Sequence, residues 1–93
     1  MREKEIEKKL VKAVKERKGM ALKFICPGLD GVPDRLILMP KGRMAFIELK
    51  SGGKPLRPIQ QRRKRQIESL GFKVFRLDDA EKIGGVLNEI QSA

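Results

Sequence analysis

The first third of the chain shows two kinds of apolar spacing in succession. Residues 3–17 carry an apolar stripe at helical spacing, and we expect Gly19 to end this helix. Residues 21–26 form a short apolar run typical of a strand, and a glycine-containing loop at residues 27–31 follows it. This part of the chain therefore predicts a helix and then a strand.

The middle of the chain has the pattern of a β-hairpin. Two apolar, β-prone runs at residues 34–39 and 43–50 flank Pro40-Lys41-Gly42, which places glycine where a three-residue hairpin loop needs a positive φ. Counting outward from Lys41 puts Asp34 opposite Glu48.

The last third predicts a helix, a strand and a helix. The first of these helices should begin near Pro58, since proline suits a first helical turn, and Gly71 should end it. Its expected buried stripe is Ile59, Ile67 and Leu70. Residues 72–77 alternate between apolar and basic side chains as a strand does, and residues 79–91 have a helical apolar face.

The element order is thus α-β-β-β-α-β-α, which predicts an α/β fold with a single mixed β-sheet and flanking helices. Helices on the sheet are expected because a central sheet must bury its faces. Ninety-three residues without an internal repeat or a low-complexity tract are expected to form one domain, residues 1–93.

The hairpin register brings two carboxylates together, which needs a reason. Directly paired side chains lie about 5 Å apart, where like charges are destabilising, and a divalent cation would remove that penalty. Lys50, two residues after Glu48, points to the same face of its strand. Asp34, Glu48 and Lys50 would then supply what phosphodiester hydrolysis requires: a metal ion to activate water and a fixed cation for developing negative charge.

Composition and charge limit the classes of molecule that this protein is expected to bind. The net charge of +10 indicates a polyanionic partner, nucleic acid first and an anionic membrane surface second, and no apolar run approaches the roughly 20 residues that span a bilayer. The N-terminus lacks the apolar segment of a signal peptide, so we expect an intracellular protein. One cysteine, Cys26, and no histidine exclude an internal disulfide, the usual zinc sites and every histidine-based mechanism.

A basic cluster follows the hairpin in sequence and has almost no compensating acid. It is expected to contact the phosphate backbone, although a solvated face is the ordinary meaning of such a run. Its members are Lys54, Arg57, Arg62, Arg63, Lys64 and Arg65.

Two further polar side chains lie on or beside apolar stripes. Gln60 falls on the stripe of the helix that begins near Pro58, so it needs partners: the loop backbone, or the metal site or a substrate phosphate. Glu7 lies beside the stripe of the first helix, where it could pair with nearby lysines or turn inward to a metal. Glu3 is its rival nearer the helix end.

Four segments together resemble a known family. They read GVPDRLIL, AFIELKSGG, LRPIQ and LGFKVFRL, and they contain the pattern Pro33-Asp34 followed by Glu48-Leu49-Lys50. This pattern resembles the PD-(D/E)xK nuclease signature, and the wider set resembles the VRR-Nuc family, the virus-type replication and repair nucleases of that superfamily, over nearly the whole chain.

The resemblance implies a restriction-endonuclease-like core and DNA cleavage that depends on Mg²⁺ or Mn²⁺. By position, Asp34 and Glu48 would hold the metal together with the Leu49 carbonyl, and Lys50 would orient the attacking water or stabilise the transition state. Gln60 takes the place of the family's helix glutamine, and we assign the acid of the first helix to Glu7. The resemblance also implies a homodimer that acts on branched DNA, as Holliday-junction resolvases do, with two active sites on one junction. If the protein is virus-encoded, we expect it to act in the host cytoplasm.

With the resemblance beside the residues, we expect in-line attack of metal-bound water on a DNA phosphodiester. Lys50 is expected to act by its charge, because a lysine of ordinary pKa is a poor base at neutral pH. Two rival readings remain open: a non-catalytic basic DNA-binding module, and a regulatory subunit with no nucleic-acid partner.

Overall fold

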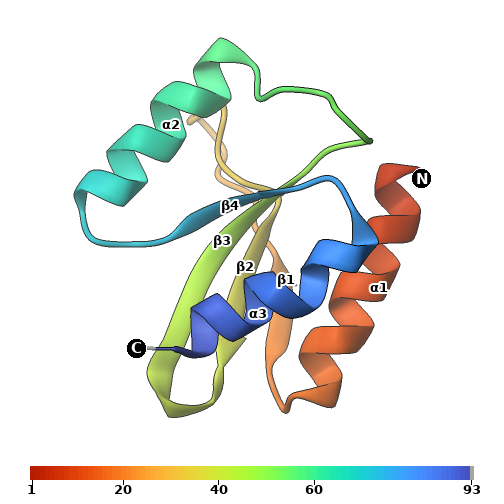
Figure 1. The fold of residues 1–93 in the computed structure, drawn as a ribbon. Helices are drawn as coiled ribbons and strands as arrows, with labels where there is room; N and C mark the ends of the chain where they lie inside the picture. Colours follow the sequence, from red (N-terminus) through yellow and green to blue (C-terminus); the bar gives the residue numbers. More distant parts are fainter. Residues whose placement is uncertain (93) are drawn as a thin grey trace.

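The computed structural model describes residues 1–92, which form one four-stranded sheet and three α-helices (Figure 1). The helices are α1 (Glu3–Glu16), α2 (Pro58–Ser69) and α3 (Ile83–Gln91), with short 3-10 turns at Pro40–Gly42 and Ala80–Lys82. The strands are β1 (Met20–Lys23), β2 (Arg35–Met39), β3 (Arg43–Leu49) and β4 (Val74–Leu77). This order confirms the predicted mixed α/β fold.

The sheet has its strands in chain order, β1-β2-β3-β4. The first three strands are antiparallel, and β4 runs parallel to β3, with Glu48 beside Arg76. The predicted hairpin register is confirmed: Met39 pairs with Arg43 and Arg35 with Ile47. Both Lys41 and Gly42 have positive φ in the connecting turn, whereas positive φ was expected only at the glycine.

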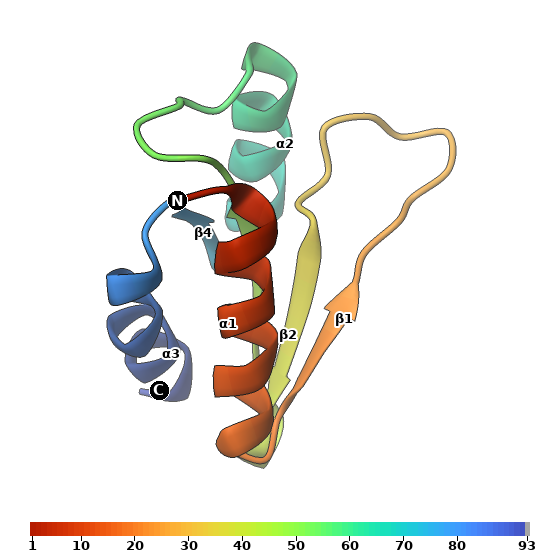
Figure 2. The same ribbon diagram turned by 90° about the vertical axis from the view of Figure 1, so that its right-hand side faces the viewer.

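The hydrophobic core lies on one side of the sheet, between it and the helices α1 and α3. Figure 2 shows both helices on that side. Residues of β2 and β3 that alternate along the strands, such as Ile37, Ala45 and Ile47, pack there and are fully buried. They meet Leu10 of α1 and Leu87 of α3, which are equally buried. The other side of the sheet meets α2, which contacts β4.

Several predicted boundaries were wrong. The strands expected at residues 21–26 and 72–77 are shorter, and the expected last helix at residues 79–91 begins as a 3-10 turn. Helix α1 ends at Glu16, before Gly19, and the residue with positive φ that follows it is Lys18, with φ 68°. Gly19 is instead a point of close approach, where an added Cβ would lie 2.4 Å from Sδ of Met39.

The predicted buried stripe of α2 was also wrong. Ile59 and Ile67 are only half-buried, and Leu70, which follows the helix, is 75% exposed. Gln60 is the residue of α2 that is buried. The packing of α2 therefore depends on a polar contact and on the loop before β2, more than on an apolar stripe.

That loop touches α2 at a glycine, which gives a test of the packing. Gly31 has φ +82°, and a Cβ there would lie 2.7 Å from the carbonyl oxygen of Ile59, whereas Gly28 has φ +83° with no atom within 4 Å. We expect Gly28→Ala to cost about 1–2 kcal/mol from its backbone alone, and Gly31→Ala to cost about 1–3 kcal/mol more from the steric clash. Urea unfolding measures both; equal losses would contradict a tight contact at Gly31.

Candidate active site

The predicted site residues lie where β2 begins and β3 ends. Asp34 immediately precedes β2, and its Oδ2 accepts a hydrogen bond from the backbone N–H of Leu49 at 2.8 Å. Because Arg35 pairs with Ile47, Asp34 comes opposite Glu48. The hairpin thus brings together the two carboxylates that the register predicted.

Glu48 is a buried carboxylate, 5% exposed, with partners on one oxygen only. Its Oε2 accepts a hydrogen bond from Nε2 of Gln60 at 2.7 Å and lies 3.7 Å from Nζ of Lys50. Its Oε1 is buried and has no hydrogen-bond partner within residues 1–92. A buried acceptor left unsatisfied costs stability, so this oxygen is a position where a cation or donor would be favourable.

The environment of Glu48 opposes its charge. Burial, and then the neighbouring charge of Asp34, raise the pKa of Glu48 from its ordinary 4.5 to about 7, although Lys50 lowers it. Two adjacent acids, one of them buried, do not both ionise easily at neutral pH without a compensating positive charge.

Gln60 connects α2 to this carboxylate. Its Oε1 accepts the backbone N–H of Arg57 at 2.9 Å, at the start of the helix, while its Nε2 donates to Glu48. Gln60 therefore bonds both to the backbone at the start of α2 and to Glu48. The fixed amide orientation holds Glu48 in place.

The loop between Lys50 and α2 is fastened to the end of β4. Arg76 donates to the carbonyl of Lys54 at 2.8 Å, and Asp78 accepts from the backbone N–H of Gly53 at 3.1 Å. That hydrogen bond, helped by Arg76, lowers the pKa of Asp78. This pair, which the sequence analysis did not single out, limits the freedom of the segment that follows Lys50.

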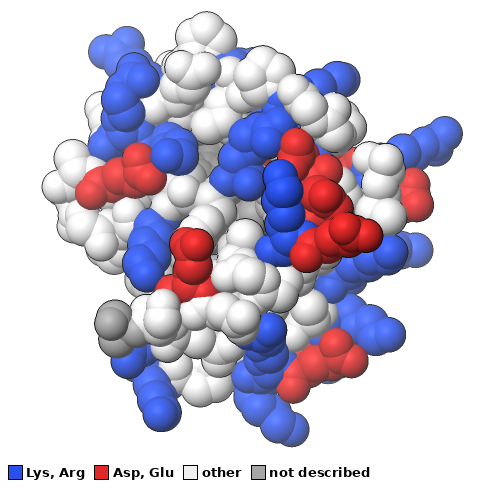
Figure 3. Space-filling view, viewed as in Figure 1, with Lys and Arg blue, Asp and Glu red and all other residues white. Residues whose placement is uncertain are grey.

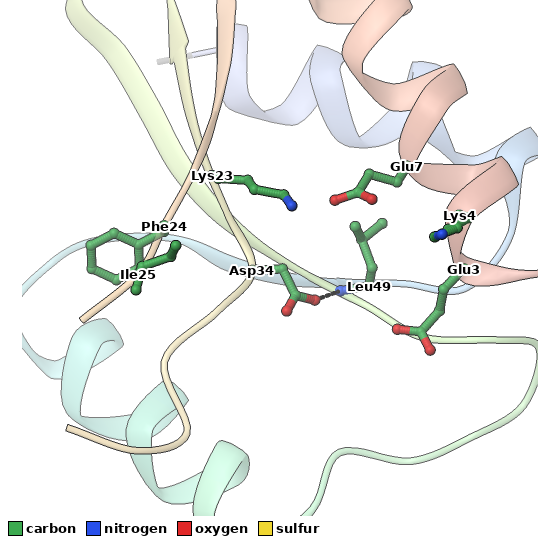
Figure 4. Close-up of a pocket in the computed structure, with 8 residues that line it drawn as sticks. All are labelled: Glu3, Lys4, Glu7, Lys23, Phe24, Ile25, Asp34 and Leu49. Atoms are coloured by element: carbon green, nitrogen blue, oxygen red, sulfur yellow. Dashed lines mark hydrogen bonds between the residues drawn. The ribbon is translucent and has the colours of Figure 1, made fainter. Parts of the chain in front are cut away.

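A pocket of about 380 Å³ opens beside Asp34 and Leu49 (Figure 4). Glu3, Lys4 and Glu7 of α1 line it from one side, and Lys23, Phe24 and Ile25 from the other. Both acids that the sequence offered for the first helix therefore reach the same pocket.

Glu7 has a partner that sequence spacing did not suggest. Its Oε2 lies 3.0 Å from both Nε and Nη2 of Arg35, and Nη1 of Arg35 donates to the carbonyl of Ala21. Glu3 is exposed, and its charge contributes a small rise to the pKa of Glu48. The lysine pairing considered for Glu7 is replaced by a long-range pair that joins α1 to β2.

The residues described, 1–92, contain no group of three or more acidic, histidine or cysteine side chains placed to hold a metal ion. Asp34 and Glu48 are a pair, so a hard cation here would complete its shell with backbone oxygen, water or phosphate, as magnesium commonly does. The orphaned Oε1 of Glu48 fits such an ion. No helix in this part of the chain is long and apolar enough to cross a membrane.

The basic cluster divides into exposed and internally bonded members. Arg57, Arg62 and Arg65 are exposed. Arg63 donates to the carbonyl of Asp30 at 2.7 Å, and Lys64 pairs with Glu68 at 2.9 Å. In Figure 3, lysine and arginine side chains gather over α2, while charges of both signs mix over α1 and the start of α3.

Comparisons with known proteins agree with this geometry. No family model matches the sequence. A phage protein named "Putative nuclease p44", from Acyrthosiphon pisum secondary endosymbiont phage 1, is 42% identical over 81 residues, which are 87% of this chain and 87% of the relative. A solved structure named "VRR_NUC domain" has the same fold, with a TM-score of 0.87 over 92% of this chain and 94% of its own, at 23% identity. The chain belongs to the VRR-Nuc family of nucleases.

Proposed function

We propose that this protein is an endonuclease that hydrolyses DNA phosphodiester bonds with Mg²⁺ or Mn²⁺, selectively on branched DNA. The observation that carries the proposal is Glu48, a buried acid opposite Asp34 with an oxygen that lacks a partner. Membership of a nuclease family and the net charge of +10 support a DNA substrate. The name of the phage relative describes a nuclease as well.

Each side chain has a separate task in this proposal. Asp34 and Glu48 would hold the ion together with the Leu49 carbonyl, and Gln60 keeps Glu48 oriented through its hydrogen bond. A bound divalent cation would supply a polarised phosphate and a water of lowered pKa. Lys50 is placed beside Glu48 and would stabilise the negative charge that builds on the phosphate.

Glu7 would act in the same site from α1. It lines the pocket beside Asp34, and its bond to Arg35 holds the helix against β2. Residues 1–93 would act as one nuclease domain, and a homodimer would bring two sites to a junction.

The proposed reaction is tested by cleavage of linear, flap and four-way-junction DNA with and without Mg²⁺ or Mn²⁺. Asp34→Asn, Glu48→Gln and Lys50→Ala should each lower the cleavage rate by at least about 100-fold, because each removes a group that acts on the transition state. DNA binding should persist in all three. Glu81→Gln, which removes an exposed acid of the 3-10 turn before α3, should cut normally.

Two results would contradict the proposal. Cleavage by Asp34→Asn and Lys50→Ala at the wild-type rate would remove the assigned site. Binding without metal-dependent cleavage by the wild-type protein would favour a non-catalytic DNA-binding module.

The raised pKa of Glu48 predicts how stability changes with pH in the absence of metal. The folded state holds the Glu48 proton up to about pH 7 and the unfolded state only to about 4.5, so this contribution to stability is lost as pH rises between these values. Between pH 5.5 and 8, wild type should lose about 2 kcal/mol relative to Glu48→Gln. Urea unfolding at both pH values measures this difference. A constant difference would mean that Glu48 ionises normally.

The exposed arginines of α2 predict a salt-dependent contribution to binding. These substitutions are made in the catalytically inactive Glu48→Gln protein, so that DNA binding is measured without cleavage. Replacing Arg62 and Arg65 together by alanine should weaken its affinity for DNA. It should also reduce the slope of log affinity against log salt concentration by about 2. Replacing Lys12 and Lys15 removes the same charge from α1, at exposed positions that follow the pocket-lining Glu7 along the helix, and should change the slope little. Equal effects of both pairs would indicate general charge attraction without a binding face on α2.

A further inference from the structure

One wall of the pocket beside Asp34 is formed by the end of β1 and the residues that follow it. We call it the β1 wall; it consists of Lys23, Phe24 and Ile25, and α1 forms the wall on the other side (Figure 4). The proposed reaction uses Asp34 and Glu7 from this pocket and gives the β1 wall no task. In Figure 2 the segment that continues from this wall toward β2 projects beyond the sheet.

The β1 wall presents an apolar side chain to solvent. Ile25 is 76% exposed, the largest exposed fraction among the large apolar side chains of residues 1–92. A single exposed isoleucine is ordinary on a protein surface, so its exposure alone indicates no function. Its position is unusual, because no other exposed large apolar side chain of the described residues lines the pocket beside Asp34.

The residue before Ile25 is fastened to the site. The backbone N–H of Phe24 donates to the carbonyl of Asp34 at 2.9 Å, one residue beyond the end of β1. The ring of Phe24 packs on Phe46, with the two ring centroids 5.3 Å apart. Ile25 is therefore exposed on an anchored backbone, and a contact made from such a position costs little conformational freedom.

The β1 wall also carries a lysine that no acid neutralises. Lys23 is exposed, and in Figure 4 its ammonium group points across the pocket toward Glu7. Glu7 is held instead by Arg35 at 3.0 Å, and no ion pair within residues 1–92 includes Lys23. An exposed lysine in this state is available to a phosphate group.

The acids of the pocket make such a cation necessary. Glu3, Glu7 and Asp34 line the pocket and would repel a phosphate that approaches it. None of the basic cluster on and before α2 lines this pocket. The cations placed to offset the repulsion here are Lys4 on the α1 side and Lys23 on the β1 wall.

A nucleotide combines the two groups that the β1 wall accepts. Its phosphate suits the ammonium group of Lys23, and the face of its base is a surface on which Ile25 can pack. In a continuous duplex the bases are stacked, so exposing a base face costs free energy. At a branch point the stacking is already weakened, and the cost is smaller. The wall therefore favours a nucleotide at a branch point.

We propose that the β1 wall contacts the substrate strand beside the scissile phosphate. Lys23 binds a neighbouring phosphate, and Ile25 packs against a base that has left the stack. The inference rests on the proposed function for its DNA substrate, and it gives a physical reason for selectivity toward branched DNA. It adds Lys23 and Ile25 to the residues that contact DNA.

The contact of Ile25 is tested with four-way-junction DNA that carries 2-aminopurine at each branch-point position in turn. The fluorescence of this adenine analogue rises when it leaves the base stack. Glu48→Gln protein in EDTA is used, so that binding is measured without cleavage. We expect the fluorescence to rise at one or more positions. Adding Ile25→Ser should abolish this rise and weaken junction affinity about tenfold, as expected when an isoleucine side chain is no longer buried.

Two further variants control for this loss. Ile25→Met keeps an apolar side chain and should retain both the fluorescence rise and the affinity. Leu70→Ser makes the same kind of change at a side chain that is 75% exposed but lies outside this pocket, and it should bind as Glu48→Gln does. Circular dichroism should show an intact fold in each variant, because both substituted side chains are exposed.

The contact of Lys23 is tested by the salt dependence of binding to the same junction. Lys23→Ala in Glu48→Gln should reduce the slope of log affinity against log salt concentration by about 1, as the loss of one phosphate contact predicts. Lys12→Ala removes the same charge from an exposed position of α1 outside the pocket and should leave the slope unchanged.

The proposal is overturned if no branch-point position gains fluorescence, or if Ile25→Ser or Lys23→Ala behaves as its control does. Cleavage by the wild-type protein with that result would leave the proposed function standing. Wild-type protein that cuts no DNA would instead overturn the proposed function, and loss of binding in both variants would still establish the contact.

Discussion

The burial of one carboxylate is the constraint on which the rest of the site depends. Glu48 lies near the end of β3, between the core residues Ile47 and Leu49. Its Oε2 has both Gln60 and Lys50 as partners, while its Oε1 has no partner in the described chain. A buried acid with this environment is costly to ionise, so its retention requires a compensating group. Burial and Asp34 raise the pKa of Glu48, and a cation shared with Asp34 would offset both effects.

The fold supplies this constraint from separate parts of the chain. The hairpin register sets Asp34 opposite Glu48, the start of α2 delivers Gln60, and Arg76 and Asp78 fasten the loop between them. The core between the sheet and α1 and α3 is built from other residues, such as Ile37 and Leu87. Changes to the site can therefore be made with limited damage to the core, which is why conservative variants there are informative.

Local patterns predicted much of this from the sequence. The turn chemistry of Pro40-Lys41-Gly42 fixed the hairpin register, and that register alone brought Asp34 to Glu48. Proline at the first turn located the start of α2, and the helical spacing of this segment placed Gln60 on its inward face. These features depend on neighbours in sequence, so spacing is enough to reveal them.

What the sequence did not reveal depends on contacts between distant segments. The pair of Glu7 with Arg35 joins residues 28 positions apart, and Arg76 reaches the loop at Lys54 across 22 positions. Leu70 was expected to be buried because its spacing suits a helix stripe, yet α2 covers only the end of the sheet and leaves it 75% exposed. An amphipathic pattern says which face is apolar, but it does not say whether the same chain covers that face.

The most direct test of the account is the pKa of Glu48 itself, followed through its side-chain carboxyl carbon by nuclear magnetic resonance. The account predicts a pKa near 7 in metal-free protein, and a marked fall when Mg²⁺ is added, because a cation favours the ionised form. A pKa near the ordinary 4.5 that does not respond to Mg²⁺ would contradict it.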